Sequence, residues 1–372
     1  MNDLFYFGLT QKSAPLAIRD RLRADRDSQR AFLSRLSEFA GGRMVLATCE
    51  RFEIYAASLC ADRRIWTSFL ASWFGLPPGC FENHVRTLSG PLVAEHLLRV
   101  AAGLDSRIVG ERQILGQVRN AHETALEEGA LDAQLSLLAR TAIRAGKRVR
   151  QETQLDSGRS IVTMAMDWLA DTRESICGKR VAVVGSGRLA GLVVSEVIQR
   201  RPQCVTITGR NESRAAELAS HHAAQNAMMS ALPQTVARSE IVFACTASPS
   251  YLIDSALIGE GRAAPLQITD LCVPRNVDPC VADLPFVTLS HLDQIVSHGL
   301  SVSRSGHTVP GSEAVKYAET IVGEELESFL RWQRERRTVP MIADLLSRAG
   351  AGAIGKRALH EQIMRLKSGV AV

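Results

Sequence analysis

One segment constrains the fold more than any other: the apolar run Arg180–Val184, followed directly by the glycine turn Gly185–Ala190. The turn reads G-S-G-R-L-A, and the residues after it predict an apolar helix over Leu189–Ile198. A strand, a G-x-G-x-x-A turn and a helix in that order are typical of a dinucleotide-binding βαβ unit. We therefore expect a Rossmann-type domain in the middle of the chain.

The positions of this turn have separate physical uses. Gly185 allows the tight turn, Gly187 lets the backbone approach a pyrophosphate, and Ala190 is small enough for close helix packing. The free N–H groups at the start of the helix attract the phosphate charge. The turn residues predicted to bind the cofactor are Gly185, Ser186, Gly187, Arg188, Leu189 and Ala190.

The next predicted strand, Cys204–Gly209, indicates which dinucleotide is bound. An NAD site usually ends this strand with Asp or Glu, which holds the ribose 2′-hydroxyl. Here Arg210 and Asn211 follow it, and Arg214 comes one turn later. Cationic side chains suit a 2′-phosphate, so the sequence favours NADPH as the cofactor. Solvated charges at the start of a helix are the alternative explanation.

A cysteine in the N-terminal region is a candidate nucleophile. Cys49 follows the apolar run Met44–Ala47 and lies between Thr48 and the nearby Arg51. The thiolate is the reactive form of cysteine, and a neighbouring cation stabilises it. A thiol together with a dinucleotide site indicates reduction of an acyl group through a thioester. A buried core cysteine is the alternative that the residues leave open.

Composition excludes several other classes of protein. Hydrophobic residues make up 46% of the 372 residues, and no uncharged apolar run reaches the roughly 18 residues of a membrane span. The eight cysteines form no C-x-x-C pair and no zinc-ligand spacing, so we expect reduced thiols, no metal site and a cytoplasmic protein. A net charge of +5 permits a polyanionic partner without requiring one.

The order of predicted elements indicates a multidomain chain. Residues 1–155 read as an α+β N-terminal domain, with strands at Leu4–Leu9, Met44–Leu46 and Phe52–Ala56. Residues 156–305 alternate strands and helices, which is typical of an α/β doubly wound sheet. Residues 306–372 begin with the long helical pattern Ser312–Arg337. Proline disfavours helix at the residue before it, so Pro340 should end this helix and start a short all-α region.

Four longer segments carry a family resemblance. Thr48–Tyr55 is similar to the motif T-C-N-R-T-E-[IL]-Y, and Gly103–Val118 to G-L-D-S-x-x-x-G-E-P-Q-I-L-G-Q-V. Asp270–Pro279 is similar to D-[IL]-A-V-P-R-D-[IV]-x-P, and Gly8–Pro15 to G-[IL]-N-H-K-T-A-P. On these motifs the chain resembles the glutamyl-tRNA reductases over roughly residues 4–340.

The resemblance implies a reaction and its residues. Cys49 would attack the ester of glutamyl-tRNA, and NADPH would reduce the thioester to glutamate-1-semialdehyde for tetrapyrrole synthesis. His96 would act as a general acid for the leaving ribose hydroxyl, although a lone histidine in an apolar helix is otherwise structural. Arg51 would hold the substrate carboxylate. The positions implied to bind substrate are Thr48, Glu50, Arg51, Ser106, Glu111, Arg112, Gln113 and Gln117.

Several residues depart from the family motifs. Glu50 replaces Asn beside the thiol. A carboxylate there opposes thiolate formation unless Arg51 pairs with it. Alternatively, Glu50 receives the α-ammonium of the substrate. Phe52 replaces Thr, Arg112 replaces Pro, and Gln11 replaces His. These changes leave open a paralogue that reduces another activated acyl group, or a silent regulator that binds tRNA or a reductase.

The resemblance also implies partners. A homodimer is expected, weakened because only 32 residues follow Pro340, and an aminomutase would consume the reactive semialdehyde. A basic helical patch is a candidate for tRNA phosphates, although a solvated helix face explains it equally well. Its residues are Arg140, Arg144, Lys147, Arg148 and Arg150.

Overall fold

A four-stranded antiparallel sheet organises the N-terminal domain. The computed structural model describes residues 3–22, 26–58, 62–153, 155, 160–172, 175–246, 248–259, 262, 264–301, 312–350, 359–361 and 364. The strand order is β2-β3-β1-β4, and neighbouring strands run antiparallel. The strands are β1 (Asp3–Thr10), β2 (Ala40–Ala47), β3 (Arg51–Ser58) and β4 (Arg86–Ser89).

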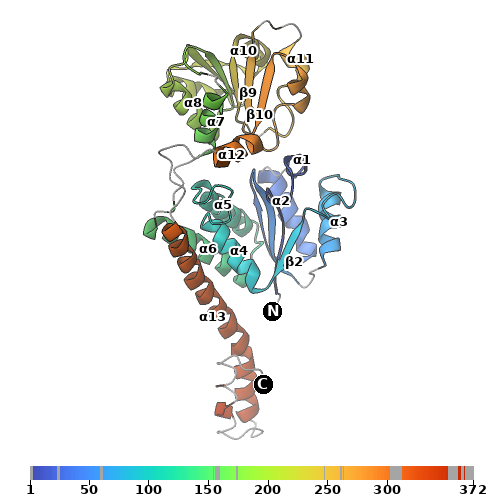
Figure 1. The fold of residues 1–372 in the computed structure, drawn as a ribbon. Coiled ribbons are helices and arrows are strands. Elements are labelled where there is room, and N and C mark those ends of the chain that lie inside the picture. The colour runs from blue at the N-terminus through green and yellow to red at the C-terminus, as the bar shows by residue number, and fades with distance from the viewer. Residues whose placement is uncertain are drawn as a thin grey trace.

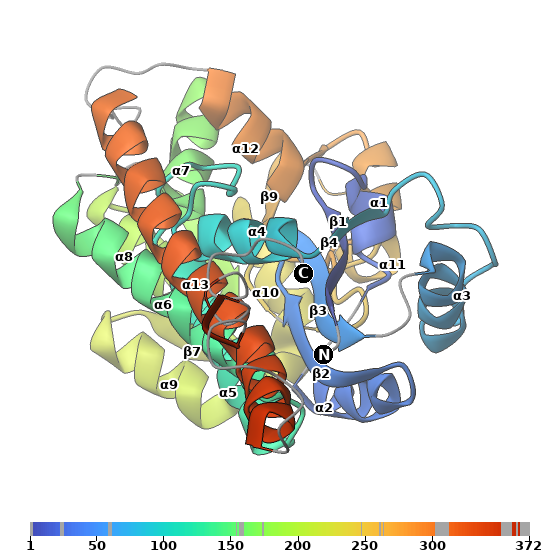
Figure 2. The same ribbon diagram turned by 90° about the horizontal axis from the view of Figure 1, so that it is seen from below.

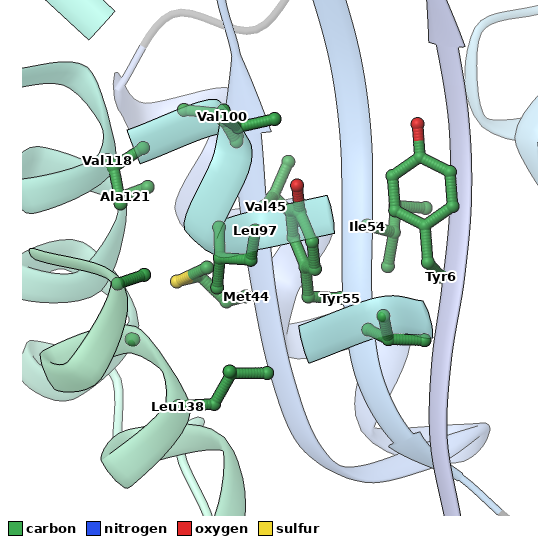
Figure 3. Packing of buried hydrophobic residues seen from close by; sticks show 14 of the residues in the cluster. Tyr6, Met44, Val45, Ile54, Tyr55, Leu97, Val100, Val118, Ala121 and Leu138 are labelled. Atoms are coloured by element: carbon green, nitrogen blue, oxygen red, sulfur yellow. The ribbon is translucent and has the colours of Figure 1, made fainter. Parts of the chain in front are cut away.

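Helices cover both faces of this sheet because its strands alternate two sets of buried side chains. On one face Phe52 packs edge-to-face against Phe32 of α2 (Arg26–Arg35), and Phe5 and Phe7 pack against Trp66 of α3 (Arg63–Trp73). The other face meets α4 (Pro91–Ala101), α5 (Gln113–Glu127) and α6 (Ala133–Glu152). Figure 3 shows this side, where Val118 and Ala121 of α5 lie toward β2.

The middle of the chain forms the expected parallel sheet. Its order is β10-β9-β8-β5-β6-β7, and every neighbouring pair is parallel. The chain therefore leaves β5 in one direction for β6 and in the other for β8. A ligand crevice is expected at the carboxyl ends of strands where the order reverses in this way. The strands are β5 (Arg180–Val184), β6 (Cys204–Thr208), β7 (Gln225–Ala227), β8 (Ile241–Ala244), β9 (Leu266–Asp270) and β10 (Val287–His291).

Helices flank this parallel sheet, and Figure 1 shows α12 lying between it and the N-terminal domain. The sequence analysis predicted α8 but placed no helix at α7 or α12, which pack against each other. The helices are α7 (Ile161–Asp171), α8 (Arg188–Gln199), α9 (Glu212–His221), α10 (Leu232–Arg238), α11 (Ser255–Ile258) and α12 (Leu292–Ser301). The short helices elsewhere are α1 (Leu16–Arg19) and the 3₁₀ turns Leu36–Glu38, Met229–Ala231 and Pro279–Asp283.

The C-terminal helix corrects one prediction. Helix α13 runs unbroken from Ser312 to Gly350, so Pro340 does not end it. A proline removes one backbone hydrogen bond and costs roughly 3 kcal/mol. In a helix of 39 residues the bonds on either side of Pro340 are retained, and its N-terminal part packs against α6 and α4. Figure 2 shows α13 lying along α6.

Two further statements follow for the described part of the chain. None of its helices is both long and apolar enough to cross a membrane. Cys60, one of the eight cysteines expected to be reduced, lies outside the described residues.

Candidate active site

A tight turn between β2 and β3 presents Cys49. The backbone N–H of Thr48 donates to the carbonyl of Arg51 at 2.8 Å, which closes the hairpin. The Thr48 hydroxyl accepts from the N–H groups of Glu50 and Arg51 at 3.1 and 3.2 Å. Thr48 therefore shapes the turn that holds the thiol, and it does not line the cavity described next.

The two domains meet at this turn through Arg19, which the sequence analysis did not select. Its guanidinium is only 4% exposed and donates to the carbonyl oxygen of Cys49. The same group forms a two-pronged ion pair with Asp293 of α12, at 2.7 and 2.8 Å. Arg107 donates to the same carboxylate at 3.0 Å, and Asp20 pairs with Arg275 at 2.5 Å. These bonds fix the thiol against the nucleotide-binding domain.

A cavity of about 540 Å³ lies at this contact. It brings together Cys49 and Glu50 of the N-terminal domain with Arg188 and Leu189 of the glycine turn. Glu111, Arg112, Gln113 and Gln117 line it as well, so eight predicted site residues share one cavity. Sequence reasoning missed the rest of the lining, which is Ile108, Ser160, Ile161, Thr246, Leu271, Cys272, Val273, Leu292 and Val296.

The glycine turn has the shape that a pyrophosphate requires. Gly185 has φ +141°, and a Cβ there would lie 2.4 Å from the carbonyl oxygen of Cys245. A Cβ on Gly187 would meet nothing within 4 Å, so the backbone is open to a ligand at this point. Gly187 also caps the start of α8, whose free N–H groups favour an anion. Ala190 is fully buried and Ser186 lies against Gly209.

Burial and two nearby carboxylates oppose ionisation of the Cys49 thiol. Burial, then Glu50 and then Glu111 raise the pKa of Cys49 to about 12, and Arg19 is the cation that lowers it. Arg51 does not supply the stabilising charge that the sequence predicted. Burial, followed by the charge of Glu50, raises the pKa of the Glu111 carboxyl to about 7. The resting site therefore holds a protonated thiol beside a carboxyl that titrates near neutral pH.

The structure does not bring Arg51 or His96 to the cavity. Strand alternation turns Arg51 toward α4, where its 1% exposed side chain bonds Glu53 at 3.0 Å and the carbonyl of Asp105 at 2.8 Å. His96 Nε2 lies 3.1 Å from the same Glu53 carboxylate. The predicted contacts of these two residues with substrate therefore have no support in this geometry.

Glu53 is the centre of that buried network. The hydroxyls of Tyr55 and Tyr6 also donate to it, at 2.7 and 3.2 Å. Burial alone would raise the pKa of Glu53, but the charges of Arg51 and His96 outweigh burial and hold it at about 2. The network joins β1, β3, α4 and the loop at Asp105, so it fixes these elements relative to one another.

The other residues singled out in the sequence do not line this cavity. Ser106 is buried, and its hydroxyl has no partner among the described residues. Asn211 caps α9 by accepting from the N–H of Arg214 at 3.0 Å. Arg210 and Arg214, which follow β6, are both exposed. Phe52 faces the aromatic core and not the cavity.

The basic patch on α6 is partly used within the chain. Arg144 bonds Glu325 of α13 at 2.5 Å, and Arg148 bonds Glu324 and Glu325 at 2.9 and 3.2 Å. These pairs help to attach α13 to the N-terminal domain. Within the described residues no cluster of three His, Cys, Asp or Glu side chains has the arrangement of a metal site.

A thiol on one domain and a nucleotide turn on the other, facing one cavity, define a Rossmann-type oxidoreductase. Family models match all three regions of the chain. The model "Glutamyl-tRNAGlu reductase, N-terminal domain" matches residues 7–153, and "Shikimate / quinate 5-dehydrogenase" matches residues 169–297. The model "Glutamyl-tRNAGlu reductase, dimerisation domain" matches residues 317–369.

The chain is also similar in sequence to curated glutamyl-tRNA reductases. The chain is 34% identical to the glutamyl-tRNA reductase of Moorella thermoacetica, over 92% of this chain and 79% of the relative. It is 35% identical to glutamyl-tRNA reductase 1 of a Nocardioides species, over 92% and 80%. The solved glutamyl-tRNA reductase of Methanopyrus kandleri is 28% identical, with a TM-score of 0.47, and covers 100% of this chain and 90% of its own. The chain belongs to the glutamyl-tRNA reductase family.

The charge of Glu50 can be tested on the thiol directly. Removing this carboxylate in Glu50→Asn should lower the pKa of Cys49, because one of the two charges that raise it is lost. A shift of about one pKa unit gives about ten times more thiolate below the pKa. We expect alkylation of Cys49 by iodoacetamide, followed by peptide mass spectrometry from pH 7 to 10, to be faster by up to that factor.

Glu217→Asn is the matched control, since this exposed carboxylate of α9 does not line the cavity. Equal alkylation rates in Glu50→Asn, the control and the unchanged protein would contradict the proposed influence of Glu50.

Proposed function

We propose that this chain is an NADPH-dependent glutamyl-tRNA reductase, which forms glutamate-1-semialdehyde in the first step of 5-aminolevulinate and tetrapyrrole synthesis. The observation that carries the proposal is the single cavity shared by Cys49 and the glycine-turn residues Arg188 and Leu189. An acyl group on the thiol and a nicotinamide held at the turn would meet there. Membership of the family gives the substrate class.

The first step is thioester formation at Cys49. The sulfur attacks the carbonyl carbon of the glutamyl ester, and the thiol proton passes to the carboxylate of Glu111. The bond from that carbon to the tRNA ribose oxygen breaks, and Glu111 returns the proton to the leaving oxygen. Glu111 suits both transfers because its pKa of about 7 lies near the pH of the reaction. Free tRNA and a glutamyl thioester result.

The cavity offers a charge for each end of the glutamyl group. Arg112 lines it from the N-terminal domain, and we assign the substrate's side-chain carboxylate to this guanidinium. Glu50 lies at the same cavity beside the thiol, and we assign the α-ammonium to it. This replaces Arg51, which is already bonded to Glu53 and Asp105.

The second step consumes the thioester. When bound, NADPH would supply a hydride to the thioester carbon. The carbon–sulfur bond would break as the aldehyde forms, and the sulfur of Cys49 would take up a proton to return to the free thiol. Gly185 and Gly187 would hold the pyrophosphate at the start of α8. Arg210 and Arg214 would hold the 2′-phosphate, since no carboxylate ends β6.

The assembly belongs to the same proposal. The match of residues 317–369 to a dimerisation domain supports a homodimer, and an aminomutase is the partner that would take the reactive semialdehyde. We propose domain boundaries at 1–155, 156–305 and 306–372. The junctions at 156 and 306 fall outside the described residues.

The central test is NADPH oxidation by the purified protein with glutamyl-tRNA. Cys49→Ser should lose at least about 10³-fold in rate, because a serine hydroxyl is a far weaker nucleophile than a thiol. Cys280→Ser is the matched control, since that thiol is exposed and outside the cavity.

Two results would contradict the proposal. Oxidation that survives in Cys49→Ser would exclude a Cys49 thioester. Binding of tRNA and NADPH without oxidation by the unchanged protein would favour the regulator or another acyl donor.

A second prediction concerns pH. A base must be deprotonated to accept the thiol proton, so kcat/KM should rise with pH through about 7 as Glu111 ionises. Glu111→Gln should lower kcat/KM by about 10²-fold or more and remove this rising limb. Rates from pH 5.5 to 8.5 check this, and an unchanged limb in Glu111→Gln would assign it to another group.

A third prediction concerns the cofactor. Arg210→Ala should raise KM for NADPH by about tenfold, because a charged contact to the 2′-phosphate is lost, and should leave KM for NADH unchanged. Arg201→Ala tests a nearby arginine that precedes β6 instead of following it. Equal effects of Arg210→Ala on both cofactors would exclude the assignment.

A further inference from the structure

A second cavity adjoins the one that holds the thiol. It has a volume of about 360 Å³ and lies in the N-terminal domain between α2, β2 and α5. Gln117 lines both cavities. Ala47 of the second cavity precedes Cys49 of the first by only two residues along the turn. The two cavities therefore adjoin near the turn that carries the thiol.

The lining of this cavity suits a ligand that has both apolar and polar parts and carries no phosphate. Val45 and Ala121, two of its apolar residues, are almost completely buried, and Figure 3 shows Ala121 on the side of α5 that faces β2. Its polar groups are mostly uncharged, and within the described residues no lysine or arginine lines it. A phosphate site would need such cations. The polar residues are Gln29, Gln117, Asn120, Glu123 and Thr124.

We propose that this cavity binds the 3′-terminal adenosine of the aminoacyl-tRNA substrate. This rests on the proposed function, which places the ester carbonyl at Cys49. The esterified ribose is bonded directly to that carbonyl, so its base must lie in a cavity next to the thiol. The 540 Å³ cavity is shared with the glycine turn and must hold the glutamyl group and the nicotinamide. The adjoining cavity of about 360 Å³ is then the space left for the adenine base.

The side chains present match the edge of an adenine. Asn and Gln amides pair with its ring nitrogen and amino group as acceptor and donor. The carboxylate of Glu123 accepts from an exocyclic amine, and the volume of 360 Å³ falls within the roughly 300–1,000 Å³ of small-ligand sites. Gln117, between the cavities, is placed to contact the ribose that joins base and ester. The cavity thus aligns the ester with Cys49 by holding its leaving group.

A filling substitution tests this location. Asn120 is an exposed residue at the cavity, so Asn120→Trp should fold and block the space. Leu126→Trp, on the same helix and 59% exposed, lies outside the cavity and is the control. NADPH oxidation is measured with glutamyl-tRNA and with a glutamyl thioester of N-acetylcysteamine, which has no nucleoside.

The ratio of kcat/KM for glutamyl-tRNA to that for the small thioester should fall about tenfold to a hundredfold in Asn120→Trp. It should stay unchanged in Leu126→Trp. An unchanged ratio in Asn120→Trp, with the unchanged protein active, would overturn the subsite alone. Inactivity of the unchanged protein with both substrates would overturn the proposed function itself.

Photocrosslinking locates the base independently of turnover. A tRNA that carries 8-azidoadenosine at its 3′ end is irradiated with the full-length protein, and the labelled peptide is sequenced by mass spectrometry. Labels within residues 117–124 or 45–47 are expected. Labels confined to the nucleotide-binding domain would overturn the assignment.

Discussion

The site depends on one buried guanidinium. Arg19 bonds the backbone carbonyl of Cys49 and the carboxylate of Asp293 together, so one side chain ties the thiol turn to α12. Neither domain alone contains the cavity, because residues of both domains line it. The bonds of Arg19 hold the two domains together at that cavity. A buried arginine needs such partners because an unpaired charge in the interior is costly. The ion pair therefore has a positional consequence: it sets how the thiol faces the cofactor turn.

The surroundings of Cys49 disfavour its thiolate form. Burial and the carboxylates of Glu50 and Glu111 keep Cys49 protonated, and Arg19 offsets only part of their effect. A substrate ammonium at Glu50 would neutralise one of the two opposing charges, so binding of the correct acyl donor would itself favour the thiolate. Such a site would keep the cysteine less prone to oxidation before substrate binds, since oxidation follows thiolate character.

The sequence predicted those features that are local. The strand, turn and helix at Arg180–Ile198 and the two strands that flank Cys49 are short-range patterns, and the structure contains them as predicted. Arg51 lies outside the cavity because strand alternation, which is visible in the sequence, places it on the face of Glu53 and Tyr55. Arg19 and Asp293 are 274 residues apart, and no local pattern links them. The continuity of α13 through Pro340 likewise depends on its length and packing, which outweigh a local proline rule.

The departures from the family motif have different meanings once their faces are known. Phe52 lies in the aromatic layer with Phe32 and Phe74, so it changes packing behind the sheet and not the cavity. Glu50 and Arg112 both line the cavity, where the family has an uncharged amide and a proline. They add one negative and one positive charge, which leaves the net charge of the cavity as it was. Glutamyl esters carry an ammonium and a carboxylate, so under the proposed assignment this pair would complement the substrate without changing the net charge of the cavity.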